Sequence, residues 1–132
     1  MELVFINHQD LWHFERLHQR LKEVLQWEMG FLNKSKASKV IITSVYRPLA
    51  EEIRQGRSGI HGLHRAIDQV IIKQDGTAFS QNDYDSLAII INKAFFYGDR
   101  KHNVAVSFPH GTGLHIHLQA RDETTYRNRI NA

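Results

Sequence analysis

The sequence contains no cysteine, and this absence excludes several kinds of chemistry. Without cysteine there is no disulfide, no thiol nucleophile and no thiolate ligand, so a metal would have to be bound by His, Asp or Glu. Proline is scarce, with 2 in 132 residues, and low-complexity tracts are missing. With 42% hydrophobic and 23% charged residues, the chain is expected to form one domain over 1–132 around a single core.

Long hydrophobic runs are also absent. No apolar segment reaches the roughly 20 residues that a membrane-spanning helix needs, so no membrane partner is expected. The first residues lack the basic and apolar parts of a signal peptide, which predicts synthesis in the cytoplasm without one. The formal net charge of +3 is spread along the chain without a nucleic-acid-binding motif, so no nucleic-acid partner is expected. The basic bias indicates either an ordinary solvated surface or attraction to an anionic cell-wall polymer.

Two segments have apolar residues at helical spacing. The first predicts a helix at about 10–30 with Asp10 as its N-cap. The second predicts a helix that begins after the N-cap Ser80 and ends near Gly98. The polar residues from about Thr124 onward are expected to fray.

Four short segments have the composition of strands. They cover residues 40–45, 66–72, 103–108 and 113–119. The last two are close enough in the chain to form a hairpin, and the glycine-containing segment 49–65 is expected to be irregular. The order of elements predicts an α+β domain in which helices pack on one face of a mostly antiparallel sheet of about four strands.

The residues with the most chemical potential are two histidines and an aspartate, with a third histidine beside the last of them. They are His61, Asp68 and His117, with His115. Two imidazoles and one carboxylate can fill three positions of a tetrahedral zinc site and leave the fourth to water, as catalytic zinc sites do. Positions i and i+2 of a strand face the same side, so His115 and His117 are expected to project together.

Each of these residues also has a simpler interpretation. A pair of histidines is common on a solvent-facing strand. Asp68 lies among the apolar residues of 66–72, where a carboxylate is unfavourable unless it is paired or bound to a metal. The alternatives to a metal are that Asp68 faces solvent or pairs with Arg65 or Arg47.

The spacing His61-x-x-x-x-Ala66-x-Asp68 resembles the H-x-x-G-x-A-x-D motif of the zinc peptidases of family M15. That group includes D-alanyl-D-alanine carboxypeptidases and dipeptidases, phage endolysins and the signalling domain of Hedgehog proteins. The resemblance extends over about residues 40–119, and the order of the motifs and the chain length agree with it.

Two further motifs contribute to the resemblance. His115-Ile-His117 is similar to the H-x-H near the end of those domains, and Thr43-Ser-Val-Tyr-Arg-Pro48 is similar to their S-x-Y-R strand end. The resemblance implies a Hedgehog/DD-peptidase-like fold. It also implies a Zn²⁺ cofactor with three ligands, His61, Asp68 and His117.

The resemblance further implies roles for residues around the metal. His115 would act as the base or stabilise the transition state. Arg47 would act in catalysis and substrate binding by holding a substrate carboxylate or the developing oxyanion, and Ser58 would contact the substrate.

The chain departs from the family motif at three places. His64 replaces the family glycine, and Gly59 stands where the family has serine, with Ser58 one place earlier. The glutamate that usually precedes the last ligand and serves as the base is missing. His115, or His110, would then have to accept the proton, and a member that binds zinc without hydrolysis is an open alternative.

The expected function is therefore that of a zinc-dependent peptidase acting on bacterial peptidoglycan, as a D-Ala-D-Ala carboxypeptidase or a phage endolysin. The expected partner is the peptide stem or cross-bridge, the expected state is a monomer, and release to the cell wall would be of the phage type. A zinc-binding module of the same fold without turnover is one alternative. A metal-free phage accessory protein is the other.

Overall fold

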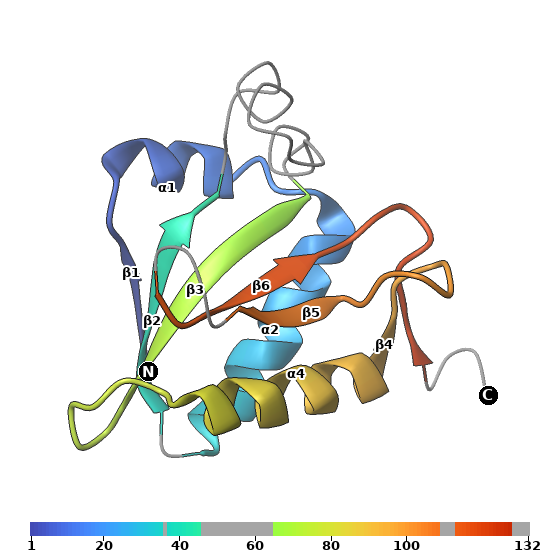
Figure 1. Cartoon of the computed structure of the whole chain (residues 1–132). Coiled ribbons are helices and arrows are strands. Elements are labelled where there is room, and N and C mark those ends of the chain that lie inside the picture. The colour runs from blue at the N-terminus through green and yellow to red at the C-terminus, as the bar shows by residue number, and fades with distance from the viewer. Residues whose placement is uncertain (36, 46–64, 109–112, 128–132) are drawn as a thin grey trace.

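The computed structural model describes residues 1–35, 37–45, 65–108 and 113–127, and within them it shows an α+β fold. Figure 1 shows how the elements are arranged. In chain order they are β1 (Glu2–Phe5), α1 (His8–Phe14), α2 (Gln19–Asn33), β2 (Ala37–Ser44), β3 (Ala66–Lys73), α4 (Gln81–Ala94), β4 (Phe95–Phe96), β5 (Ala105–Phe108), β6 (His115–Gln119) and β7 (Thr125–Tyr126). Among the described residues, no helix is long and apolar enough to cross a bilayer.

The main sheet has five strands in the order β1-β2-β3-β6-β5. β1 runs parallel to β2, and the other three neighbouring pairs are antiparallel, so the sheet is mixed. The prediction of about four strands missed β1, whose four residues give only a short pattern. The expected pairing of the segments that became β5 and β6 is confirmed. β4 and β7 form a separate two-stranded sheet.

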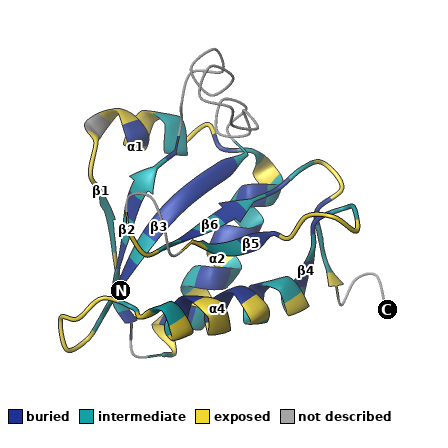
Figure 2. Cartoon of the chain, viewed as in Figure 1, coloured by how far each residue is buried: buried dark blue, intermediate teal, exposed yellow. Residues whose placement is uncertain are grey.

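The core lies between the sheet and α2, which crosses behind the sheet in Figure 1. α2 contributes an apolar stripe of buried residues: Leu21, Val24, Leu25 and Leu32. Alternate residues of each strand point toward this stripe, because successive side chains of a strand face opposite sides. The large apolar strand residues that are fully buried are Val40, Ile42, Ile67, Ile71, Ile116 and Leu118. Figure 2 shows β3, in the centre of the sheet, buried along most of its length.

The single helix predicted at about 10–30 is wrong, since the structure divides it into α1 and α2. Helix α1 ends at Phe14, and α2 begins after His18, whose ψ of 137° is not helical. The His18 ring accepts a hydrogen bond from the Arg20 backbone N–H at 3.1 Å. His18 therefore acts as an N-cap that starts α2. Asp10 lies inside α1, which has Asn7 as its N-cap, so the predicted cap at Asp10 is also wrong.

The second predicted helix is α4, and Ser80 caps it as expected. The Ser80 hydroxyl accepts from the Asp83 backbone N–H, and the Asp83 carboxylate accepts from the Ser80 N–H, which completes a capping box. The helix ends at Ala94 instead of Gly98, because Phe95 and Phe96 are extended and pair with β7. Gly98 has a different role. It has a φ of +123°, and a Cβ at this position would lie 2.8 Å from Cβ of Glu123.

The segment expected to fray from about Thr124 is ordered through β7. Thr124 is buried, and its hydroxyl donates to the carbonyl of Tyr97 at 2.7 Å. The same hydroxyl accepts from the backbone N–H of Arg121 at 2.9 Å. These contacts attach the residues after β6 to the residues after α4, so the prediction of fraying is wrong for 124–126. The segment 49–64, expected to be irregular, lies outside the described residues.

Candidate functional site

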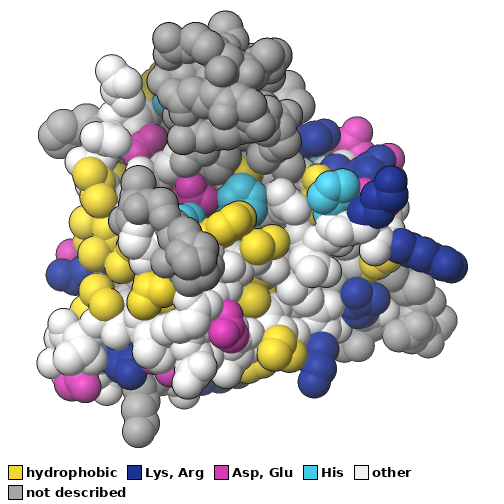
Figure 3. Space-filling view, viewed as in Figure 1, with side chains coloured by type: hydrophobic (Ala, Val, Ile, Leu, Met, Phe, Trp, Pro, Cys, Tyr) yellow, Lys and Arg dark blue, Asp and Glu magenta, His cyan; other side chains and the backbone are white. Residues whose placement is uncertain are grey.

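Asp68 and His117 lie directly opposite each other in the antiparallel pair of β3 and β6. Nδ1 of His117 is 2.8 Å from Oδ1 of Asp68, and the two side chains are 12% and 10% exposed, respectively. They share the face opposite α2, because Ile67 and Ile116, one residue earlier on each strand, are in the core. The structure thus brings together two of the predicted ligands, and the alternative that Asp68 faces solvent is wrong. In Figure 3, histidine and acidic side chains meet near the middle of this face, beside hydrophobic side chains.

His117 also has a contact on its other side. Nε2 of His117 is 3.0 Å from Oε1 of Gln119, two residues further along β6 on the same face. The side-chain amide of Gln119 donates in turn to the carbonyl of Asn103 at 2.8 Å. Sequence reasoning missed Gln119, although its i+2 spacing from His117 was visible.

His115 projects from β6 on the same face, as expected. Its Nδ1 is 2.9 Å from the carbonyl oxygen of Gly113. A carbonyl only accepts, so Nδ1 carries the proton and Nε2 keeps its lone pair in the neutral ring. Phe108, the partner of His115 in the β5–β6 register, stacks on the His115 ring with centroids 5.3 Å apart. It also meets the His117 ring edge-to-face at 5.9 Å, so Phe108 helps to orient both histidines.

The remaining predicted site residues lie outside the described residues. They are Arg47, Ser58 and His61, together with the variant motif position His64 and the alternative base His110. Over the described ranges, no group of three or more His, Asp or Glu residues is arranged to bind a metal ion. Of the three predicted ligands, Asp68 and His117 are therefore within the described residues, and His61 is not.

A second polar pair lies on the other face of β3. Gln69 follows Asp68 in the chain, and its side-chain amide donates to Oε1 of Glu28 in α2 at 2.8 Å. Both residues are fully buried. Burial raises the pKa of the Glu28 carboxyl to about 8, and the hydrogen bond from Gln69 opposes this rise to a smaller extent. Sequence reasoning missed the pair, although Glu28 continues the helical spacing of the buried residues Leu21 and Leu25.

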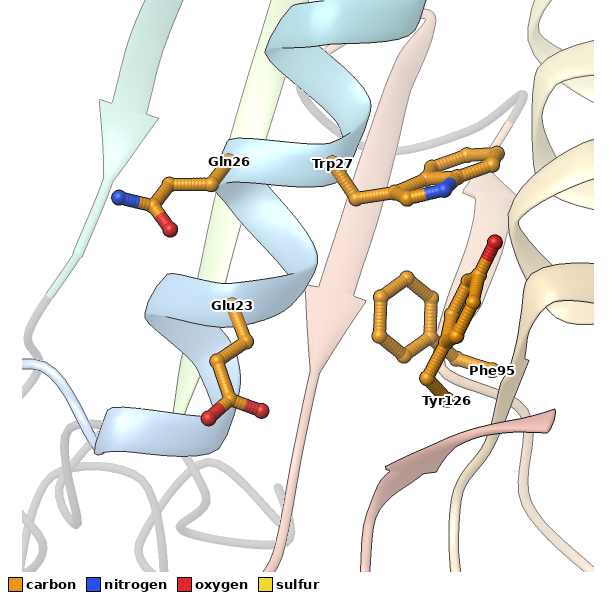
Figure 4. Close-up of a pocket in the computed structure, with 5 residues that line it drawn as sticks. All are labelled: Glu23, Gln26, Trp27, Phe95 and Tyr126. Atoms are coloured by element: carbon orange, nitrogen blue, oxygen red, sulfur yellow. The ribbon is translucent and has the colours of Figure 1, made fainter. Parts of the chain in front are cut away.

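An open pocket of about 480 Å³ lies elsewhere, between α2, β4 and β7. Figure 4 shows its lining residues, Glu23, Gln26, Trp27, Phe95 and Tyr126. Two ring pairs meet edge-to-face in this lining: the ring centroids of Trp27 and Phe95 are 5.8 Å apart, and those of Phe95 and Tyr126 are 5.4 Å apart. None of the predicted site residues lines this pocket, so the pocket does not support the predicted zinc site.

Comparisons of the chain with family models, with curated proteins and with solved structures find no match. The chemistry that this chain can perform must therefore be inferred from the geometry of its own residues. The most informative part of that geometry is the pair of Asp68 and His117, because it joins two strands through the atoms that a metal would use.

Proposed function

We propose that the chain is a zinc-dependent peptidase that hydrolyses peptide bonds in bacterial peptidoglycan, with a Hedgehog/DD-peptidase-like fold. The proposed zinc ligands are His61, Asp68 and His117. The observation that carries the proposal is the 2.8 Å distance between Oδ1 of Asp68 and Nδ1 of His117. Ligand atoms about 2.0–2.1 Å from a tetrahedral zinc ion lie about 3.3 Å apart. An outward shift of about 0.5 Å would therefore let the two atoms share such an ion.

The residue types also fit zinc. Imidazole nitrogen and carboxylate oxygen are both common zinc ligands, and a site of two histidines and one aspartate has only one negative charge. Such a site is net positive when zinc is bound, which favours the negative charge that develops on the carbonyl oxygen during hydrolysis. Bound zinc supplies a Lewis acid and lowers the pKa of water at the site.

His115 is the proposed base. Its Nδ1 donates to Gly113, so Nε2 of the neutral ring is able to accept a proton from the attacking water. Hydrolysis adds the hydroxyl of that water to the carbonyl carbon, and the proton held by His115 passes to the leaving amine as the C–N bond breaks. Arg47 is proposed to hold a free carboxylate of the substrate, a group that the peptide stems of peptidoglycan possess.

The test compares wild type with Asp68→Ala. Wild type is expected to bind about one zinc ion per chain and to release new peptide termini from purified cell walls. Asp68→Ala is expected to lose at least about 100-fold in zinc affinity and to release no termini above background. The matched control is Asp85→Ala, which removes a carboxylate on α4 whose partner is Gln81 and should change neither property.

The outcomes separate the alternatives. Unaltered zinc content and activity in Asp68→Ala would contradict the proposed ligand set. Zinc binding without new termini in wild type, detected by mass spectrometry, would favour a binding module without turnover. Absence of zinc, together with thermal unfolding that a chelator does not change, would favour a metal-free accessory protein.

A further inference from the structure

The pocket of about 480 Å³ beside α2 has aromatic walls, and we call it the aromatic pocket. Two of its rings, Phe95 and Tyr126, are opposite residues in the β4–β7 pair, so they share one face of this small sheet. The third ring, Trp27, comes from α2. Figure 4 shows the three rings together at one side of the pocket, with Glu23 and Gln26 along α2 at the other.

The rings of the aromatic pocket are steeply inclined to one another. The planes of Trp27 and Phe95 meet at 89°, and those of Phe95 and Tyr126 meet at 62°. Rings in this arrangement form adjacent walls around a space, whereas parallel rings would stack and close it. The face of an aromatic ring carries negative charge density, so the faces that line the pocket attract a cation.

The indole ring of Trp27 has one face covered by another ring. Phe31, one turn later in α2, stacks on it with centroids 5.9 Å apart and planes at 2°. Glu23 lies one turn before Trp27, so the other face of the indole looks toward Glu23 and the pocket. In the described part of the chain no lysine or arginine lies over this ring, whereas Arg16 lies 3.3 Å from the ring centroid of Trp12.

The charged group in the lining is a carboxylate. The side chain of Glu23 is 34% exposed, and its Oε2 accepts from Nη1 of Arg20 at 3.3 Å. An exposed ion pair of this kind is weak, and among the described residues no group contacts Oε1 of Glu23. The described lining therefore combines ring faces with a carboxylate and contains no lysine, arginine or histidine.

We propose that the aromatic pocket binds a quaternary ammonium group carried by a larger molecule. A primary ammonium is strongly hydrated and needs an acceptor for each of its three N–H donors. Three of the five lining side chains are rings, so a cation without N–H donors matches them better. The pocket is open and has the volume of a small-molecule site, so the rest of the ligand can extend into solvent. The proposal depends neither on zinc nor on peptide hydrolysis.

The experiment titrates the chain with choline and with 3,3-dimethylbutan-1-ol, which has the same shape but a carbon atom in place of the charged nitrogen. ¹H–¹⁵N spectra follow the two indole N–H groups of the chain, which belong to Trp12 and Trp27. Choline is expected to shift the signal of Trp27 with a dissociation constant of about 1 mM. The signal of Trp12, which is outside the pocket, should not move. The alcohol should bind at least about 10-fold more weakly.

Variants separate the contributions of the rings and the carboxylate. Tyr126→Leu removes a ring and should weaken choline binding about 3- to 30-fold, whereas Tyr126→Phe keeps the ring and should stay within about 2-fold of wild type. Glu23→Gln removes the charge and should weaken binding about 2- to 5-fold. The matched controls are Phe96→Leu, which removes a ring on the other face of β4, and Glu15→Gln, which removes an exposed carboxylate outside the pocket. Both should bind choline as wild type does.

Three results would overturn the proposal. The first is equal binding of choline and the alcohol, which would make the pocket a general apolar site. The second is a Trp27 signal that choline at about 50 mM does not move. The third is wild-type affinity for choline in Tyr126→Leu or Glu23→Gln. If Tyr126→Leu does not fold, Glu23→Gln against Glu15→Gln decides, because neither of these substitutions removes core packing. No zinc or cell wall is used, so failure here leaves the peptidase proposal unaffected.

Discussion

Asp68 and Gln69 are neighbours in β3, but their side chains lie on opposite faces of the sheet and belong to two different polar pairs. Asp68 pairs with His117 across the β3–β6 ladder on the face opposite α2. Gln69 pairs with Glu28 beneath α2, where neither side chain is exposed. Each pair includes one carboxyl group in an otherwise apolar strand or helix stripe, so the comparison isolates the effect of the surroundings.

The buried pair is best satisfied when it is neutral. Oε2 of Glu28 and Oε1 of Gln69 are both buried without a hydrogen-bond partner in the described part of the chain. Two acceptors cannot bond to each other, but a proton on the Glu28 carboxyl turns one of its oxygens into a donor. This agrees with the pKa of Glu28, which burial raises to about 8. The pair therefore acts as a structural element at neutral pH.

The other pair is suited to chemistry. An imidazole is a good partner for an ionised carboxylate, and both can give up their mutual contact to bind a cation. The two faces therefore differ in what they do to a carboxyl group. A carboxyl group buried beneath a helix becomes neutral, whereas a carboxyl group beside a histidine on the other face has a partner for its charged form. Substitutions at Gln69, Glu28 and His115 test this comparison, and their expected effects on the free energy of unfolding decrease in that order.

Gln69→Leu should have the largest effect. It leaves the buried Glu28 carboxyl without its partner, which is expected to lower the free energy of unfolding by about 2–3 kcal/mol at neutral pH. Asp68→Asn, one residue away on the other face, retains an oxygen that can accept from His117 and should lower it by about 1 kcal/mol or less without metal. Urea unfolding of the metal-free chains measures both. Equal losses would show that the two faces do not differ in the way proposed.

Glu28→Gln should change how stability depends on pH. The folded pKa of about 8 exceeds the usual 4.5, so the folded chain holds this proton more tightly than the unfolded chain. The contribution to stability is fully present below pH 4.5 and is lost as pH rises through 8, by about 1.4 kcal/mol per pH unit. Glu28→Gln cannot titrate, so its stability relative to wild type should rise by about 2 kcal/mol between about pH 5.5 and 7.0.

The control for this prediction is Glu28→Leu. It also removes the titrating group, so its stability relative to wild type should rise by the same amount with pH. It should nevertheless be less stable than Glu28→Gln at every pH, because the Gln69 amide then lacks a partner in the core. A difference between Glu28→Gln and wild type that stays constant over this pH range would contradict the raised pKa.

Local patterns in the sequence predicted the parts of the fold that local interactions determine. The runs of β-branched residues gave β2 and β3, and Ser80 marked the start of α4. The break between α1 and α2 could not be predicted, because the apolar spacing continues through it. The hydrogen bond by which the His18 ring caps α2 depends on the ring orientation, which the sequence does not reveal. β1, β4 and β7 are short, and their pairing depends on partners distant in the chain.

The candidate site was predictable to a similar extent. The resemblance to the zinc peptidases implied that Asp68 and His117 share a metal site. The register of β3 and β6 places the two residues opposite each other, and their binding of a metal stays a prediction. The contact of Gln119 with His117 depends on side-chain orientation, which no sequence pattern encodes. Glu28 could have been found from the spacing of the buried residues in α2, but its partner Gln69 lies 41 residues away.

His115→Gln should have the smallest effect on stability and a large effect on activity. The side chain is partly exposed, and glutamine can still donate to the Gly113 carbonyl, so the free energy of unfolding should change by less than about 0.5 kcal/mol. Glutamine cannot accept and return a proton, so peptide release from cell walls should fall about 10²- to 10⁴-fold with zinc content unchanged. His102→Gln, at an exposed turn, is the control and should hydrolyse normally. If His115→Gln releases peptide termini at the wild-type rate, a group other than His115 accepts the proton. The pair of Asp68 and His117 would then not need His115 for hydrolysis.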